Sequence, residues 1–170
     1  MAWKEINIRA WKESAVKAIS DDWALVTAGS EKAYNMMTVS WGGLGEIWGK
    51  DAAFIFIRYS RYTLQFLEEN DRFTIAFFGG GYRKALALCG SKSGRDCDKA
   101  QQAGLTPVFD GGAPYFAQAS VVLRCRKMAK YDLLPEGFLD PAIEGNYADG
   151  DYHRMFIGEV ESVLVQEDVL

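Results

Sequence analysis

Residues 52–57, Ala-Ala-Phe-Ile-Phe-Ile, run directly into Arg58-Tyr59-Ser60-Arg61-Tyr62-Thr63. The first stretch is apolar on both faces and rich in aromatic and β-branched side chains, which is typical of a buried strand. Residues 64–70 then predict a short helix with Ser60 or Thr63 as its N-cap. A strand that leads through hydroxyls and arginines into a helix N-terminus favours an anion site, because first-turn N–H groups have no intrahelical partner. The alternative is an ordinary N-cap with its arginines in water.

Other segments on both sides of this stretch also read as strands, and the helices between them are short. In residues 120–131, Val121, Leu123 and Cys125 alternate with more polar neighbours, as expected for a half-exposed antiparallel strand. Residues 133–150 form a long loop, of the kind that is usually functional or an interface arm. We predict a mainly β fold, an antiparallel barrel with short helical insertions. The remaining predicted strands are 23–27, 34–41, ended by Gly42-Gly43-Leu44-Gly45, then 73–78 and 153–165, and the remaining helices are 11–18, 82–88 and 99–103.

The bulk properties limit the class of protein. A chain of 170 residues predicts one domain, 1–170, with an N-terminal arm over residues 1–20. A net charge of -4 argues against a general nucleic-acid binder, which needs a basic face. No apolar run is long enough to cross a bilayer and no signal peptide begins the chain, so we expect a cytoplasmic protein. Three cysteines without a C-x-x-C pair, and His153 as the single histidine, indicate neither a disulfide framework nor a metal site.

A second polar stretch, Gly90-Ser91-Lys92-Ser93-Gly94-Arg95-Asp96-Cys97-Asp98-Lys99, follows the predicted helix 82–88. Glycines let backbone N–H groups turn toward an anion, serines add donors, and the cations add charge-assisted bonds. Two familiar nucleotide motifs fail here on spacing: the third glycine of G-x-G-x-x-G would fall on Lys84, and the Walker loop needs glycine directly before its lysine. The stretch therefore predicts either a phosphate-binding loop of another kind or a solvated turn.

Several motifs in one order resemble the flavin reductase-like family, in its flavoredoxin branch. The resemblance runs from about Trp23 to Val165. It implies an FMN-binding split β-barrel, a Greek-key antiparallel barrel that forms a homodimer with the flavin near the subunit interface. The motifs that carry it are Asp22-Trp23-Ala24-Leu25-Val26-Thr27-Ala28-Gly29, Tyr34-Asn35-Met36-Met37-Thr38-Val39-Ser40-Trp41-Gly42-Gly43-Leu44-Gly45, Arg61-Tyr62-Thr63, Tyr82-Arg83-Lys84-Ala85-Leu86, Cys89 to Arg95 and Asp151-Tyr152-His153-Arg154.

The resemblance also implies which residues bind the cofactor. One segment would lie along the isoalloxazine and offer backbone donors and the Thr38 and Ser40 hydroxyls. A turn would hold the phosphate, a loop would close over the phosphate and ring, and His153 would stand near the nicotinamide, although a structural histidine is the alternative. The segment contributes Asn35, Met37, Thr38, Val39, Ser40 and Trp41, the turn Arg58, Ser60, Arg61, Tyr62 and Thr63, and the loop Ser91, Lys92, Ser93, Gly94, Arg95 and Lys99.

The sequence departs from the family pattern at three places. Tyr59 replaces a frequent proline, Gly79-Gly80-Gly81 replaces acidic residues, and Ala100 replaces an aromatic residue. The resemblance implies an NAD(P)H-dependent flavin oxidoreductase that passes hydride from nicotinamide to flavin N5, with FMN as cofactor and NADH or NADPH as donor. The alternatives are a non-enzymatic FMN electron carrier that a partner protein reduces, and a member that has lost flavin.

Overall fold

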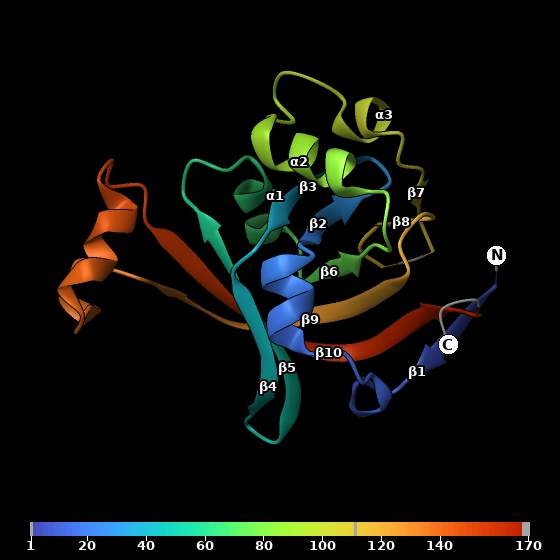
Figure 1. The fold of residues 1–170 in the computed structure, drawn as a ribbon, viewed down its shortest axis with the longest axis horizontal. Helices are drawn as coiled ribbons and strands as arrows, with labels where there is room; N and C mark the ends of the chain where they lie inside the picture. Colours follow the sequence, from blue (N-terminus) through green and yellow to red (C-terminus); the bar gives the residue numbers. More distant parts are fainter. Residues whose placement is uncertain (1, 111, 168–170) are drawn as a thin grey trace.

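The computed structural model describes residues 2–110 and 112–167, and one antiparallel sheet curled into an open barrel organises them (Figure 1). The two ends of the predicted domain and Gly111 lie outside these described residues. The strand order is β3-β2-β6-β9-β10-β5-β4, with β1 paired to the far end of β10. The mainly β fold with short helices is thereby confirmed. The strands of the sheet are β1 (Trp3–Ile6), β2 (Ala24–Ser30), β3 (Ala33–Val39), β4 (Gly42–Ile47), β5 (Lys50–Arg58), β6 (Arg72–Phe77), β9 (Val121–Asp132) and β10 (His153–Gln166).

Strand β4 corrects a sequence prediction. The glycine run 42–45 was expected to end the preceding strand, but it forms β4, paired with β5 from Gly42 opposite Ile55 to Ile47 opposite Lys50. Isolated glycines weaken a strand, yet here the neighbouring strand supplies the hydrogen bonds. A Cβ at Gly42 would lie 2.8 Å from the Phe54 carbonyl oxygen, so only glycine fits this close approach. The sheet thus ends in two edges, β3 and β4, which no ladder within the described residues joins.

The two faces of the sheet build two apolar clusters. Inside the barrel, Phe73, Leu123 and Phe156 are fully buried, whereas Val122 packs with Phe116 in a second cluster on the outer face. This alternation is the one predicted for residues 120–131. Helices α2 (Arg83–Ser91) and α3 (Lys99–Ala103), with the small hairpin β7 (Pro107–Val108) and β8 (Tyr115–Phe116), contribute to the outer cluster. The elements that carry the polar stretch 90–99 therefore sit outside the barrel wall, next to β3.

The N-terminal segment packs against the core of the barrel. After η1 (Ile8–Ala10) the chain makes a short π-helix, η2 (Lys17–Asp21), which contacts β4 and buries Ile19 in the barrel core. The helix predicted over residues 11–18 thus begins later in the chain. The first residues of the predicted range are not helical, and the Trp11 ring packs on Phe77 in the barrel with 5.0 Å between ring centroids.

Helix α1 (Thr63–Glu69) lies close to its predicted position, but neither predicted residue caps it. The N-cap position is Tyr62, which makes no capping side-chain bond. The Ser60 hydroxyl donates instead to the Asp151 carboxylate at 2.5 Å, and the Thr63 hydroxyl accepts a bond from Asn35. Both hydroxyls therefore have tertiary partners.

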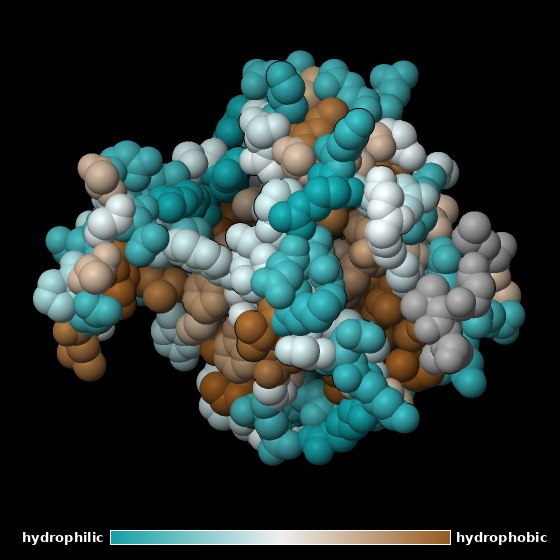
Figure 2. All heavy atoms as spheres, in the orientation of Figure 1, coloured by the Kyte–Doolittle hydropathy of each residue, from teal (hydrophilic) through white to brown (hydrophobic). Residues whose placement is uncertain are grey.

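Residues 133–152, which we call the projecting segment, leave the barrel between β9 and β10 and stand out at the left of Figure 1. They contain two short 3₁₀ helices, η3 (Pro135–Gly137) and η4 (Pro141–Tyr147). Figure 2 shows apolar atoms at the tip of this segment, and Leu139 is 96% exposed. The base of the segment returns to the barrel where β5 ends and β10 begins.

Candidate functional site

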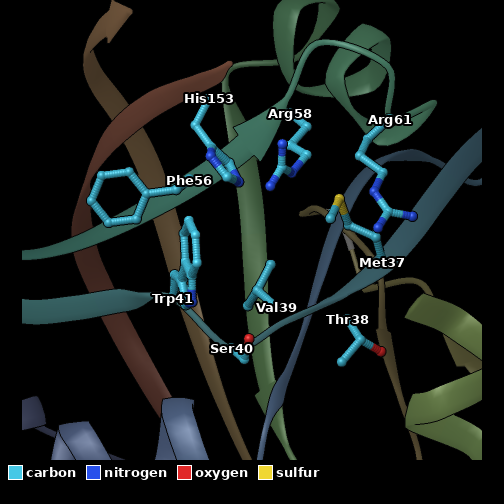
Figure 3. Close-up of a pocket in the computed structure, with 9 residues that line it drawn as sticks. All are labelled: Met37, Thr38, Val39, Ser40, Trp41, Phe56, Arg58, Arg61 and His153. Atoms are coloured by element: carbon cyan, nitrogen blue, oxygen red, sulfur yellow. The ribbon is translucent and has the colours of Figure 1, made fainter. Parts of the chain in front are cut away.

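Two adjacent hollows lie beside β3, at the open side of the barrel. The first, the open hollow, has a volume of about 230 Å³, and the second, the inner hollow, about 130 Å³. Met37 and Arg61 line both, so the two hollows are adjacent and share these side chains. Residues Met37, Thr38, Val39, Ser40, Trp41, Phe56, Arg58, Arg61 and His153 line the open hollow (Figure 3), and Asn35, Met37, Ser60, Arg61, Tyr62, Thr63, Ser91, Lys92, Ser93, Gly94 and Lys99 line the inner one.

Two cations of the inner hollow are held by the C-terminal end of α2. The Lys99 ammonium donates to the Cys89 carbonyl oxygen at 3.1 Å, and the Arg61 guanidinium donates to the Gly90 carbonyl oxygen at 2.8 Å. The last carbonyls of a helix lack intrahelical partners and carry partial negative charge, so they attract cations. The carbonyls at the end of α2 therefore bring Arg61 and Lys99, which lie on other elements, to the same place.

Lys99 is unusual because it is a buried ammonium, only 4% exposed. Its pKa is lowered, chiefly by burial, with a further contribution from the nearby Arg61 charge. An ammonium has three donors, and the Cys89 carbonyl is the one hydrogen-bond partner that Lys99 finds within the described residues. None of the described residues lining the inner hollow is acidic. A buried charge without a counter-ion is costly, and an anion bound in the hollow would lower that cost.

The floor of the inner hollow is tightly fitted. Asn35 donates its side-chain amide to the Thr63 hydroxyl at 2.8 Å, and both side chains are buried. Gly94 lies directly over this pair, since a Cβ there would come within 2.1 Å of the Asn35 side-chain oxygen and 3.2 Å of the Tyr62 ring. Glycine at position 94 thus lets the loop backbone close onto β3 and the turn before α1.

The open hollow is formed where β5 and β10 pair. His153 lies opposite Arg58 in the ladder, and Phe56 is on the same face of β5 as Arg58 because strand side chains alternate. Trp41, 46% exposed, approaches the His153 ring with 5.0 Å between centroids. Figure 3 shows these side chains around one space, with Arg61, which also lines the inner hollow, on the opposite side from Phe56.

His153 is held as a neutral ring. It is 7% exposed, and its Nδ1 lies 2.7 Å from the Tyr147 hydroxyl of the projecting segment. Burial and the positive charges of Arg58 and Arg61 lower its pKa to about 4, against the opposing effect of Asp151. At neutral pH the imidazole therefore carries no charge and can act as a hydrogen-bonding group.

Arg58 anchors the projecting segment to the open hollow. Its guanidinium donates to the Asp151 carbonyl oxygen at 2.7 Å and the Asn146 carbonyl oxygen at 2.9 Å, and it lies over the Tyr147 ring at 5.2 Å. Asp151 in turn accepts from the backbone N–H of Ser60 at 3.0 Å. Arg58 is thus committed to this segment and lines the open hollow, away from the inner hollow that contains the other residues of its turn.

The structure brings almost all sequence-predicted site residues to the two hollows, with two differences in detail. Arg95 lines neither hollow; its guanidinium lies over the Tyr62 ring at 4.5 Å. The Thr38 hydroxyl donates to the Leu86 carbonyl oxygen, and Figure 3 shows its side chain directed away from the open hollow. That hydroxyl is therefore engaged with α2, and position 38 can offer a ligand only its backbone.

Two residues of the site were not among those predicted. Phe56 could have been found from the sequence, because it precedes Arg58 by two positions in a predicted strand and so shares its face. Tyr147 carries no such signal, since it lies in a loop without periodicity and meets His153 only through the fold.

Other chemistry is limited in the described part of the chain. No group of three or more metal-ligating side chains occurs within residues 2–110 and 112–167. Burial raises the pKa of the Cys89 thiol to about 11 and also raises that of Cys125, which makes both poor nucleophiles at neutral pH. Among the described helices, none has the length and apolar character that a membrane span needs.

Comparison with known proteins places this geometry in context. The sequence matches the profile of the flavin reductase like domain over residues 16–170. A search of curated protein sequences gives no significant match.

Three solved structures have a similar fold. They are flavoredoxin from Methanosarcina acetivorans (TM-score 0.70, 20% identity, covering 88% of this chain and 70% of that one), an FMN-binding domain of a flavin reductases-like enzyme from Shewanella baltica (0.72, 19%, 99% and 80%), and an NADH:FAD oxidoreductase from Streptomyces globisporus (0.65, 19%, 86% and 76%).

Proposed function

The chain belongs to the flavin reductase-like domain family, and on that premise we propose that it is an FMN-binding flavin oxidoreductase that uses NADH or NADPH. The observation that carries the proposal is the inner hollow, where the buried Lys99 ammonium and Arg61 face a space that no acidic residue in the described part of the chain lines. A phosphate dianion would supply the missing counter-charge. The adjacent open hollow would then receive the flavin ring and, on its His153 side, the nicotinamide.

The phosphate end would be held by charge and by hydroxyl donors. Lys99 and Arg61 are already fixed by the carbonyls that end α2, so little side-chain freedom is lost on binding. Lys92 and the hydroxyls of Ser91 and Ser93 line the same space. Charge-assisted bonds of this kind each contribute on the order of 1.5 to 3 kcal/mol.

The other end would lie against β3. Because β3 is an edge strand, paired only with β2, the backbone groups on its outer side have no ladder partner. The backbone from Met37 to Trp41 borders the open hollow and can therefore offer these groups to a flat polar ring. FMN, when bound, supplies the redox chemistry by accepting a hydride at N5. The protein needs no nucleophile for this, in agreement with the neutral His153 and the inert buried thiols.

An FMN electron carrier, reduced by a partner protein, is the second candidate function. The fold similarity to the flavoredoxin from Methanosarcina acetivorans supports it, as does the partly exposed Trp41 at the mouth of the open hollow. Both functions share the same cofactor site and differ only in the electron donor.

We also propose that the protein forms a homodimer. Leu139 at the tip of the projecting segment and Tyr131 at its base are exposed apolar side chains, which a second subunit would cover. Light scattering of the purified protein gives its molar mass in solution. The mass of a monomer at micromolar protein concentration would contradict the homodimer proposal.

One experiment separates the functions. The purified protein is examined for a bound yellow chromophore, loaded with FMN if colourless, and mixed anaerobically with NADH and NADPH separately. Loss of flavin absorbance within a turnover time supports the oxidoreductase. A yellow protein that neither nucleotide reduces would exclude the oxidoreductase and favour the carrier, and a protein that takes up no FMN would exclude both.

A further inference from the structure

The Tyr147 hydroxyl and the His153 ring form a buried polar pair that the proposed function does not use. Tyr147 ends η4 of the projecting segment, and its oxygen lies 2.7 Å from Nδ1 of His153, the first residue of β10. Both side chains are buried, yet only His153 lines the open hollow. Tyr147 therefore sits behind the imidazole, on the side away from the hollow.

The chemistry of the two groups decides which one donates. Burial raises the pKa of Tyr147 above its ordinary value, so the hydroxyl keeps its proton at neutral pH. Within residues 2–110 and 112–167, Nδ1 is the one hydrogen-bond partner of that hydroxyl. A phenol is the better donor and an imidazole nitrogen the better acceptor, so the bond runs from Tyr147 to Nδ1. In a neutral ring that accepts at Nδ1, the proton is on Nε2.

The environment keeps the ring neutral. The charged groups facing His153 are Arg58 and Arg61, which oppose protonation, and Asp151, which favours it. Arg58 donates to the Asp151 carbonyl oxygen, and the Asp151 carboxylate accepts from the Ser60 hydroxyl, so both charged groups are held where the projecting segment meets the end of β5. The remaining ring nitrogen, Nε2, makes no hydrogen bond within the described part of the chain, and Figure 3 shows the ring at the edge of the open hollow between Trp41 and Arg58.

We propose that Tyr147 is a positioning residue that holds His153 as the neutral Nε2–H tautomer, so that the open hollow presents one fixed donor to a carbonyl oxygen of the molecule bound there. The ligand part of this inference rests on the proposed function, because the carboxamide of a nicotinamide is a carbonyl of this kind. A buried, oriented donor discriminates strongly against ligands that lack an acceptor at that point, since it is then left unpaired.

The surrounding contacts suit such a role. Tyr147 packs on Tyr152 with 4.9 Å between ring centroids and on Phe138 with 5.7 Å, and Arg58 lies over its ring. These contacts hold the phenol in one orientation. The projecting segment thereby acts on the open hollow through a single hydroxyl.

The test uses the single histidine of this chain, whose two ring nitrogens, Nδ1 and Nε2, give the imidazole signals in a ¹⁵N NMR spectrum. In the wild-type protein without ligand at pH 7, we expect one proton fixed on Nε2. Tyr147→Phe should give averaged nitrogen shifts from a mixture of tautomers. Tyr152→Phe is the matched control, because it removes a neighbouring hydroxyl that makes no hydrogen bond in the described residues. Its spectrum should be the same as that of the wild type. A proton on Nδ1 in the wild type, or a Tyr147→Phe spectrum identical to wild type, would overturn the inference.

The ligand part is tested on the FMN-loaded protein with NADH as the probe. Tyr147→Phe should raise the KM for NADH about three- to tenfold and leave the FMN affinity within twofold, whereas Tyr152→Phe should change neither. An unchanged KM beside an altered tautomer would refute the carbonyl contact. If the wild type is not reduced by NADH or NADPH, the oxidoreductase proposal fails, while the NMR spectra still decide the role of Tyr147.

Discussion

The inner and open hollows share two residues but are built in different ways. The inner hollow is made from short stretches, Ser60 to Thr63 and Ser91 to Gly94, with the start of α3, and its cations are fixed by the end of α2. The open hollow depends on the pairing of β5 with β10 and on the base of the projecting segment. The cations of the inner hollow are thus positioned by the end of one helix, whereas the protonation of His153 in the open hollow depends on the pairing of two strands and on the projecting segment.

The difference has a consequence for substitutions. Changes in the inner hollow, apart from Arg61, whose charge also lowers the pKa of His153, should alter cofactor affinity and leave the protonation of His153 as it is. Changes at His153 and its partners should alter pH dependence and the binding of a second molecule while FMN stays bound.

The largest effect is expected at Lys99. Lys99→Met keeps the length and apolar stem of the side chain and removes the buried charge, so FMN affinity should fall about 100-fold, as loss of a strong charge-assisted bond implies. The stability of the cofactor-free protein should change by no more than about 1 kcal/mol, because the cost of burying the charge disappears together with the bond to Cys89. Flavin fluorescence titration and urea unfolding measure the two quantities.

The control for this substitution is Lys84→Met, an exposed lysine of α2 that lines neither hollow. It should leave FMN affinity within twofold. Equal losses in both variants would show that only net charge matters and that the inner hollow is misassigned.

Arg61→Ala comes next, because Arg61 lines both hollows. FMN affinity should fall by about tenfold or more as a charge-assisted contact is lost and the Gly90 carbonyl loses its partner. Arg72→Ala, which removes an arginine paired with Glu161 on the exposed end of β6, is the comparison. Unchanged FMN affinity in Arg61→Ala, measured by the same titration, would mean that the phosphate binds elsewhere.

Gly94→Ala tests the close contact between loop and strand. The new Cβ would meet the Asn35 side chain at 2.1 Å, so the loop must move away. We expect FMN affinity to fall about five- to tenfold and unfolding free energy to fall by about 1 to 3 kcal/mol. Gly145→Ala, where no atom lies within 4 Å of the added Cβ, should alter neither. Wild-type behaviour of Gly94→Ala would contradict the tight floor of the inner hollow.

The smallest effect is a pH dependence at His153. Its folded pKa of about 4 lies below the unfolded value near 6.5, so between these values the unfolded chain binds the extra proton and stability falls as pH falls. Since water reaches the open hollow and screens the charges, we expect this residue to account for about 1 to 2 kcal/mol between pH 7 and pH 4.5. Urea unfolding of wild type and His153→Gln at both pH values measures this change in unfolding free energy. If the unfolding free energy of the two proteins falls equally between pH 7 and pH 4.5, His153 does not contribute to the pH dependence.

The sequence predicted the elements that local patterns specify. The apolar run 52–57 lies in β5, the segment 99–103 forms α3, and the alternation of Val121, Leu123 and Cys125 points into the barrel. The polar stretches 58–63 and 90–99 were each ambiguous alone, and the structure brings residues of both to the inner hollow.

The sequence predictions were wrong where a contact with a distant part of the chain decides the local structure. Glycines 42–45 form β4 because β5 supplies the hydrogen bonds, and the hydroxyls of Ser60 and Thr63 leave the helix end for Asp151 and Asn35. Local preferences of a few tenths of a kcal/mol to about 1 kcal/mol are overridden by such tertiary contacts.

By itself, the sequence determined the mainly β fold and the two stretches rich in hydroxyls and cations, because apolar periodicity and turn chemistry act over a few residues. Only the tertiary structure decided that Lys99 is buried with no counter-ion among residues 2–110 and 112–167, that Arg58 turns to the projecting segment, and that Tyr147 lies behind His153. These features depend on strand register and on contacts between residues far apart in the chain, which no local pattern encodes.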